Sequence, residues 1–534
     1  MNFSKYQIIS LILAIFILGL FFCFYNYFNI NNNYNPPIFN SPDETSNYFF
    51  IKNFTENNSI SRKLSYSSNE ISNVSDLIHP RSIAVNNFNL IPISFIGLIL
   101  IYGLIAKIFG VWIIQYLTPI FSIIAVIFLY LLIKKLFDKK IAIISSILTL
   151  INPGFWYFSS KLLMHNILFI SLLIISYYFL ILSIQNKKII NFILWGFFLG
   201  LSLITRTSEF LWVLLSIILI LIFYKVKINY KILLTFLIFI FVFIPVFYFN
   251  KIHNSSYFEF SYANNIDTNV VSSQISNTKT NIPTRVINII FPFGINIKNI
   301  IYVIYNFFLK LNWIFCLLLF LGIIILFIKR KNITKKEFGF IILWFLINSY
   351  LFIYYGSWKI SDTAIINSVT VGSSYIRYLL IFFVLSNILI AISINKLKNN
   401  KLTALIIGIL IAIFANISYS MVYNSKIEGE KMISKNISKF YNLKKLIITK
   451  TEDNAIIFTN RSDKFIFPER NVVFLYDYDI YNYENLKKFK DLKIPIYYFD
   501  NKKELKNTKQ NIELESVFIS DEYFLYKINF TNET

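Results

Sequence analysis

The sequence predicts a polytopic α-helical membrane protein of about eleven transmembrane helices, followed by a small external α/β domain at the C-terminal end. Three observations predict this fold class. Of the 534 residues, 56% are hydrophobic, and the mean hydropathy is +0.59. The apolar residues form blocks of about 20, long enough to cross the hydrocarbon core of a bilayer as a helix. Alternate connections between the blocks are strongly basic, as in proteins that cross a membrane repeatedly.

The net charge of +23 is explained by topology rather than by nucleic-acid binding, because the basic residues fall mostly in short connections. By the positive-inside rule, these connections and the N-terminus are cytoplasmic, and the protein lies in the plasma membrane. The other loops and the tail are then external. The predicted spans are residues 7–28, 112–133, 140–158, 163–184, 189–207, 209–224, 230–250, 311–328, 337–355, 375–394 and 402–422.

Three external regions are large: residues 29–111, 251–298 and the tail. The first contains a short apolar segment, 93–109, which we interpret as a membrane-surface or re-entrant helix. The alternation of cytoplasmic and external loops is kept only if this segment does not cross the membrane. Whether it crosses nevertheless stays open, since backbone that faces lipid must be helical in either case. We also expect the amphipathic segment 48–54 to lie on the membrane surface.

The chain divides into a membrane-embedded domain, residues 1–422, and an external α/β domain, residues 423–534. The pattern of the tail predicts a polar helix over 429–449 and a second helix over 484–492. It also predicts five short strands, at residues 455–459, 472–476, 494–499, 514–519 and 523–528.

An acidic pair, Asp43-Glu44, follows the first predicted span by about a dozen residues. A carboxylate at the lipid–water boundary can act as a general base on an acceptor hydroxyl or amine, with a membrane-anchored donor beside it. Asp43 is the preferred base, and Glu44 is a weaker candidate that orients the loop or a metal ion. The alternative is that a solvated loop simply contains acids.

Four cations on the predicted external side are candidates for binding a phosphate: Arg377 and Arg206 at helix ends, Lys161 at a turn, and Arg81 in the first external loop. The alternative for the arginines is that they extend toward the lipid headgroups, and Glu209 is a helical partner for Arg206. Candidate residues of the donor and acceptor pocket are His79, His165, Asn166 and Tyr378.

Several chemistries are disfavoured. The chain has no glycine-rich P-loop, which argues against an ATP-driven pump. No predicted span carries an acidic residue near its middle, which argues against an ion-coupled transporter. The two cysteines, Cys23 and Cys316, lie in apolar blocks, and no Cys/His metal pattern is present. The sequence identifies no cofactor with certainty, and the use of a divalent metal ion stays open.

Five motifs occur in a characteristic order: Pro42-Asp43-Glu44, His79-Pro80-Arg81 followed by 93–110, Asn152-Pro153-x-x-Trp156-Tyr157, the stretch 200–206 that ends in Thr205-Arg206, and Arg377-Tyr378-Leu379-Leu380. In these motifs, over roughly residues 1–395, the chain resembles the GT-C superfamily of glycosyltransferases. More closely, it resembles glycosyltransferase family 39, which includes protein O-mannosyltransferases and the lipid A aminoarabinose transferase. Residues 459–468 resemble external C-terminal domains of uncharacterised relatives.

The resemblance implies spans arranged around an external cavity, a polyprenyl-phosphate sugar as donor, Asp43 as catalytic base and inversion at the anomeric carbon. Three departures are visible. Many relatives have a second acid near the position of His165-Asn166, and many have proline where this chain has Ile381. The oligosaccharyltransferase signature Trp-Trp-Asp-Tyr-Gly is absent, so transfer of a whole oligosaccharide to asparagine is not expected.

The sequence therefore predicts a glycosyltransferase that moves a hexosyl- or pentosyl-type sugar from a polyprenyl phosphate to an external acceptor. Its partners are this donor, membrane lipid and a protein, lipid or glycan acceptor, with no nucleic acid. In this hypothesis Arg377, together with Arg81 or Lys161, holds the departing phosphate. Two alternatives stay open: a lipid-linked oligosaccharide flippase or transporter, and a polymerase or ligase of surface glycans, neither of which needs Asp43 as a base.

Overall fold

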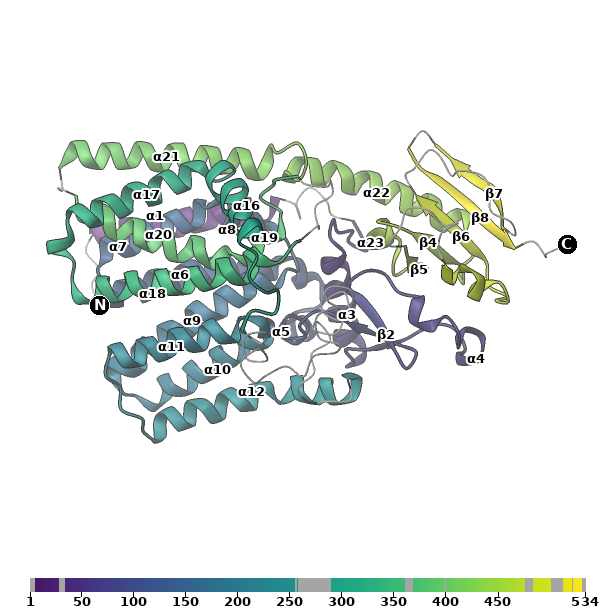
Figure 1. Ribbon diagram of the computed structural model, residues 1–534, viewed down its shortest axis with the longest axis horizontal. Helices are drawn as coiled ribbons and strands as arrows, with labels where there is room; N and C mark the ends of the chain where they lie inside the picture. Colours follow the sequence, from purple (N-terminus) through teal and green to yellow (C-terminus); the bar gives the residue numbers. More distant parts are fainter. Residues whose placement is uncertain are drawn as a thin grey trace. The chain divides into compact units, whose positions relative to one another are not determined.

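The computed structural model describes residues 5–27, 34–254, 257, 290–360, 368–397, 400–475, 484–500, 512–520 and 522–530. By its internal contacts the chain forms two compact units, and each is described here by itself (Figure 1). The helical unit comprises Met1–Ile30, Gln115–Val246 and Asn269–Met432. The mixed unit comprises Asn31–Ile114, Phe247–Thr268 and Ile433–Thr534. The predicted loop 29–111 and the predicted tail thus belong largely to one unit, while the predicted boundary between residues 422 and 423 stays a prediction.

The helical unit contains long apolar helices joined by short connections (Figure 1). Its helices are α1 (Lys5–Tyr25), α6 (Ile114–Leu136), α7 (Lys139–Ile151), α8 (Pro153–Ser160), α9 (His165–Asn186), α10 (Ile189–Thr205), η3 (Thr207–Glu209), α11 (Phe210–Phe223), α12 (Tyr230–Asn254), α16 (Ile297–Val303), the π-helical η4 (Ile304–Lys310), α17 (Trp313–Ile328), η5 (Arg330–Asn332), α18 (Lys335–Ser357), α19 (Ser374–Tyr378), α20 (Leu380–Asn395) and α21 (Lys401–Tyr423).

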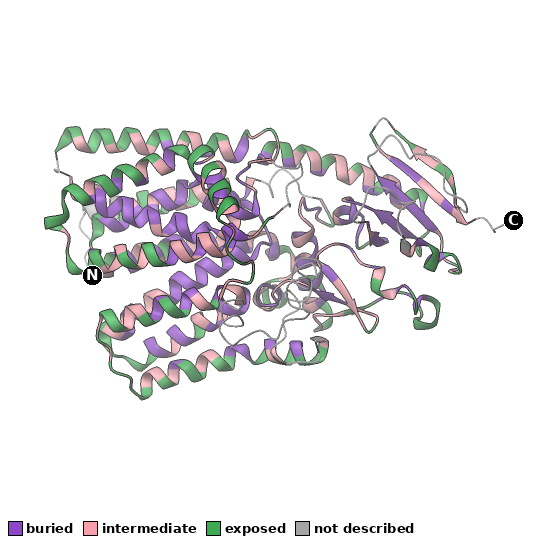
Figure 2. Cartoon of the chain, in the orientation of Figure 1, coloured by how far each residue is buried: buried purple, intermediate pink, exposed green. Residues whose placement is uncertain are grey.

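Helices α9 and α20 form the interior of this unit. α9 packs against α10, and α20 packs against α7 and α17. Both helices are buried along most of their length, whereas α12, α18 and α21 expose apolar side chains (Figure 2). Exposed apolar helix faces of this size are the expected lipid-facing surface of a membrane protein.

Among the described residues, five helices are long and apolar enough to cross a membrane: Val111–Leu136, His165–Asn186, Tyr230–His253, Lys335–Ser357 and Lys401–Tyr423. Three helix pairs pass the same test together but are bent, by 58° between α7 and α8, by 115° between α10 and the η3–α11 segment, and by 96° between the α16–η4 segment and α17. The structure thus gives a mostly helical chain with five to eight candidate spans. The predicted count of about eleven stays a prediction.

The bend between α7 and α8 has a local cause. Pro153 occupies the first position of α8, where its missing N–H costs no hydrogen bond. The Asn152 side chain accepts hydrogen bonds from the backbone N–H groups of Gly154 and Phe155, at 3.1 and 3.2 Å. Asn152-Pro153 therefore ends one helix and caps the next.

The first part of the mixed unit combines helices with a small antiparallel sheet that the sequence analysis did not predict. Its elements are α3 (Pro42–Asn57), β1 (Arg62–Lys63), α4 (Ser68–Ile71), η1 (Ser75–Leu77), β2 (Ile83–Asn86), β3 (Asn89–Pro92), α5 (Gly97–Phe109) and η2 (Val111–Ile113). The sheet has the order β1-β3-β2. α3 packs against α5, and Phe49, Phe50 and Ile51 are buried, so the segment 48–54 is covered by protein and is not a separate surface helix.

The second part of the mixed unit is the α/β fold predicted for the tail. It contains α22 (Glu430–Lys450), β4 (Ile456–Thr459), α23 (Asp463–Ile466), β5 (Asn471–Phe474), η7 (Glu484–Phe489), β6 (Ile496–Asp500), β7 (Ile512–Ile519) and β8 (Phe524–Phe530). The sheet order is β5-β4-β6-β8-β7, parallel at β5, β4 and β6 and antiparallel beyond. All five predicted strands are present, and the predicted helix 484–492 is a shorter 3-10 helix.

Predicted segment 93–109 is a helix, α5, of 13 residues. The second predicted external region, residues 251–298, lies largely outside the described residues.

Candidate functional site

The acidic pair lies in the first turn of α3. Ser41 is the N-cap, and its hydroxyl accepts a hydrogen bond from the Asp43 backbone N–H at 3.2 Å. Pro42 supplies the fixed φ that favours a first helical position. A carboxylate in a first turn is stabilised by the unpaired N–H groups of the helix end. Glu44 is buried, with 4% of its surface exposed.

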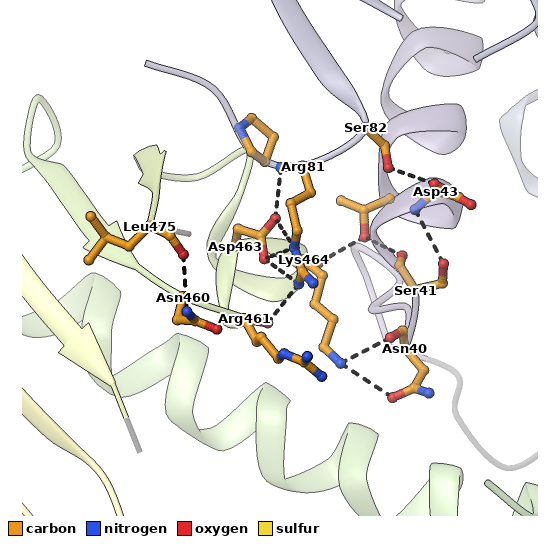
Figure 3. A network of polar contacts seen from close by, with 12 residues as sticks. Asn40, Ser41, Asp43, Arg81, Ser82, Asn460, Arg461, Asp463, Lys464 and Leu475 are labelled. Carbon is orange, nitrogen blue, oxygen red and sulfur yellow. Dashed lines mark hydrogen bonds and ion pairs between the residues drawn. The ribbon is translucent and has the colours of Figure 1, made fainter. Parts of the chain in front are cut away.

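Asp43 is held by a side chain from the segment before β2. The Ser82 hydroxyl donates a hydrogen bond to Asp43 Oδ1 at 2.6 Å (Figure 3). Ser82 has φ +63°, in the left-handed region that residues other than glycine seldom adopt. The Ser82 carbonyl accepts a hydrogen bond from the Ser46 hydroxyl at 2.8 Å, so Ser82 contacts the first two turns of α3 through two groups.

Arg81, a predicted phosphate ligand, is ion-paired with Asp463. Arg81 Nη2 lies 2.6 Å from Asp463 Oδ1, and Nε lies 3.1 Å from both carboxylate oxygens (Figure 3). The Arg81 backbone N–H donates to Asp463 Oδ2 at 2.8 Å. No sequence pattern distinguished Asp463, although the surrounding segment 459–468 carries one of the predicted resemblances.

His79, two residues earlier, is turned toward its own chain. Its Nδ1–H donates to the Pro80 carbonyl at 2.9 Å, since a carbonyl can only accept. Burial lowers the pKa of His79 below its usual value, with the nearby Asp463 and Asp76 opposing the shift.

In the helical unit, the structure brings two of the predicted cations, Arg377 and Arg206, to the ring of a third predicted residue, Tyr378. The guanidinium groups of Arg377 and Arg206 lie 4.9 and 5.0 Å from the ring centroid. Arg377 Nη2 donates to the hydroxyls of Ser374 and Tyr378, at 2.8 and 3.0 Å. Asn166 donates to the Arg377 carbonyl at 3.0 Å. His165, at the start of α9, is buried.

Arg206 and Glu209 form a buried ion pair, the helical partnership considered from the sequence. Arg206 Nη2 lies 2.6 Å from Glu209 Oε1, and the two residues are 4% and 3% exposed. Glu209 also accepts hydrogen bonds from the Tyr355 hydroxyl and the Trp212 indole, both at 2.5 Å.

Lys161 has a carboxylate partner far along the chain. Its Nζ lies 3.5 Å from Glu430 Oε1, which also accepts a hydrogen bond from the Ser160 hydroxyl at 2.7 Å. Glu430 is fully buried. Nothing in the sequence pattern distinguished Glu430 from the other charges of its polar helix.

The predicted residues divide between the two units. Asp43, Glu44, His79 and Arg81 lie in the mixed unit, and Lys161, His165, Asn166, Arg206, Arg377 and Tyr378 lie in the helical unit. Within the described ranges, no group of three or more His, Cys, Asp or Glu side chains is placed to hold a metal ion.

Comparison with known proteins shows which families and structures this chain is similar to. Residues 94–249 match the profile of the family described as dolichyl-phosphate-mannose-protein mannosyltransferase. No curated protein sequence matches the chain. Among solved structures, ArnT from Cupriavidus metallidurans bound to undecaprenyl phosphate has 8% identity and a TM-score of 0.55, over 97% of this chain and 98% of that one.

Two further structures share the fold. The apo form of the same ArnT has 9% identity and a TM-score of 0.51, over 91% of this chain and 93% of that one. The Archaeoglobus fulgidus oligosaccharyltransferase, tethered with an acceptor peptide containing the NVT sequon, has 13% identity and a TM-score of 0.52, over 91% and 69%. The chain shares the fold of these structures, and the resemblance to the GT-C superfamily predicted from the sequence is confirmed as a resemblance.

Proposed function

We propose that this protein is an inverting glycosyltransferase that moves a sugar from a polyprenyl-phosphate donor to an acceptor on the external side of the plasma membrane. The observation that carries the proposal is Asp43, a carboxylate in the first turn of a helix with a serine hydroxyl at 2.6 Å. It is supported by the match of residues 94–249 to a mannosyltransferase family and by the shared fold of ArnT bound to undecaprenyl phosphate.

In the proposed reaction, Asp43 takes the proton of an acceptor hydroxyl or amine while that atom attacks the anomeric carbon from the face opposite the phosphate. The bond between the anomeric carbon and the phosphate oxygen breaks, and polyprenyl phosphate leaves. Attack from the opposite face inverts the configuration. No nucleotide takes part, because the sugar arrives already activated on the lipid.

For the departing phosphate we propose Arg377 as the main ligand. Neutral hydroxyls of Ser374 and Tyr378 orient its guanidinium, whose planar fork suits two phosphate oxygens. Arg81, Lys161 and Arg206, each ion-paired with a carboxylate, are the other phosphate candidates. In the same proposal Asn166, His165 and Tyr378 line the donor side, and Glu44 and His79 shape the loop around Asp43.

The test is the substitution Asp43→Asn in the full-length protein, purified into lipid nanodiscs. Radiolabelled mannosyl, glucosyl and pentosyl derivatives of dolichyl and undecaprenyl phosphate serve as donors, with an envelope extract of the source cells as acceptor pool. We expect transfer to fall by about 10²–10⁴-fold, because asparagine keeps the shape but cannot take the proton.

Glu44→Gln is the matched control, and it should retain more activity than Asp43→Asn. Full activity of both variants would remove the support for an enzyme and favour a lipid-oligosaccharide transporter or a surface-glycan ligase. Activity of the wild-type protein before and after EDTA treatment decides whether a divalent metal ion takes part.

A further inference from the structure

Two consecutive residues of the C-terminal sheet domain bind residues that lie next to Asp43. Asp463 and Lys464 begin α23, between β4 and β5. Both contact the first part of the mixed unit, as Figure 3 shows. We propose that Asp463 is a positioning residue for Asp43, acting through Arg81 and Ser82. This inference rests on the proposed role of Asp43 as the general base.

The first step is the attachment of Arg81. Asp463 is fully buried and receives the Arg81 guanidinium through Nη2 and Nε, together with the Arg81 backbone N–H at 2.8 Å. Arg81 Nη2 also donates to the Arg461 carbonyl at 3.2 Å. A guanidinium–carboxylate pair with two parallel hydrogen bonds is geometrically rigid. Because the backbone N–H is bound as well, Asp463 fixes the main chain at residue 81 and not only the side chain.

The second step is the conformation of Ser82, the next residue. Its φ of +63° is unfavourable for a serine and persists only when the surroundings hold it. Asp463 holds the main chain before Ser82, and the Ser46 hydroxyl binds its carbonyl. In this conformation the Ser82 hydroxyl lies 2.6 Å from Asp43 Oδ1. The chain of contacts is thus continuous from Asp463 to the carboxylate of Asp43.

The third step concerns the acceptor of the Ser82 hydrogen bond, Asp43, which lies at the start of α3. Lys464 Nζ donates to the Asn40 carbonyl at 2.9 Å, and the Lys464 carbonyl accepts from the Thr45 hydroxyl at 2.8 Å. These contacts flank Asp43 on both sides. Asp463 and Lys464 therefore fix both Ser82 and Asp43. A general base must lie within hydrogen-bond reach of its proton, and a displacement of about 1 Å can cost roughly 100-fold in rate.

The experiment compares Asp463→Asn, Arg81→Lys and Ser82→Gly with the wild-type full-length protein, using the radiolabelled polyprenyl-phosphate donors named above. Ser82→Gly removes the hydroxyl and leaves a residue that adopts positive φ freely. We expect kcat to fall about 10- to 100-fold in each variant, with the KM for donor unchanged, because the base is displaced while the donor site is intact.

The matched control is Asp453→Asn, the same substitution in the same sheet domain. Asp453 also pairs with an arginine, Arg470, at 3.1 Å, but its side chain is exposed, whereas that of Asp463 is buried. Its kcat should equal that of the wild type. Thermal unfolding of every variant identifies loss of folding, and if Asp463→Asn does not fold, Ser82→Gly decides the question.

A double-mutant cycle separates positioning from a general structural effect. In the Asp43→Asn background, Asp463→Asn should lower the residual rate no further, because there is no base left to position. Full activity of folded Ser82→Gly would overturn the proposal. So would a higher donor KM for Arg81→Lys alone, which would assign Arg81 to the donor phosphate. If Asp43→Asn itself keeps its activity, the proposed function fails instead.

Discussion

The buried Arg206–Glu209 pair gives the strongest stability prediction for the helical unit. The substitution Glu209→Gln removes the negative charge but keeps the volume and one acceptor oxygen. In the native protein this carboxylate accepts hydrogen bonds from Arg206 Nε and Nη2, at 2.9 and 2.6 Å, and from Tyr355 and Trp212. Because Arg206 is only 4% exposed, its charge would be left buried opposite a neutral amide.

Removing one partner of such a pair costs about 3–5 kcal/mol in the free energy of unfolding. The measurement is unfolding by SDS in mixed micelles. The control is Glu56→Gln, because the Lys52–Glu56 pair spans 3.9 Å and its side chains are about half exposed. This control should lose less than about 1 kcal/mol.

The double variant Arg206→Met/Glu209→Leu tests the cause of the loss. Replacing both charges with apolar groups should restore part of the stability, because no unpaired charge remains, although the Tyr355 hydroxyl and the Trp212 indole lose their acceptor. If Glu209→Gln is as stable as the Glu56→Gln control, the pair is solvated in the folded protein and the reasoning from burial is wrong. If the double variant is as unstable as the single one, packing rather than charge explains the loss.

Three further predictions concern topology, packing and pH. In a cysteine-free background, a cysteine placed at the exposed Lys488 should react with an impermeant maleimide in intact cells. A cysteine placed at Lys331 should react only after permeabilisation, and the reverse labelling pattern would show that the predicted topology is inverted. Gly196→Ala should destabilise the helical unit, because its Cβ would lie 2.4 Å from a backbone oxygen of α12, whereas Gly408→Ala, with open space around it, should be neutral in the same unfolding assay. Burial lowers the pKa of Lys464 from 10.5 to about 8, so between these pH values the unfolded chain binds more protons than the folded chain. The free energy of unfolding of the wild type should therefore rise with pH in this range, and it should rise less in Lys464→Met.

The parts of the fold that the sequence predicted are those with a local pattern. The five tail strands were predicted because each is a short apolar run between turn residues, and the helices because their apolar blocks are long. The sheet β1-β3-β2 was missed because β1 has two exposed residues and β2 buries only its first residue, Ile83. Strand β4 is as short as β2, but all four of its residues are buried, so it stands out in the sequence as an apolar run.

The same distinction applies to the ion pairs of the candidate site. Glu209 could be considered as a partner of Arg206 because three residues along a helix bring side chains together. Asp463 lies 382 positions from Arg81, and Glu430 lies far from Lys161 in the same way. A sequence read by itself shows the cation in each pair but not its carboxylate, because that partner is supplied by the folded chain.

The location of Asp463 also bears on why this chain carries a C-terminal sheet domain. Asp43 lies in the first turn of α3, and the ends of a helix fray more readily than its interior. A base is effective only when its position is fixed, and rigid elements fix a side chain better than loops do. Strands β4 and β5 flank α23, whose Asp463 and Lys464 hold Arg81, Asn40 and Thr45. In the proposed mechanism, the sheet domain therefore fixes the N-terminal end of α3, and truncation of the domain should abolish transfer even with Asp43 intact.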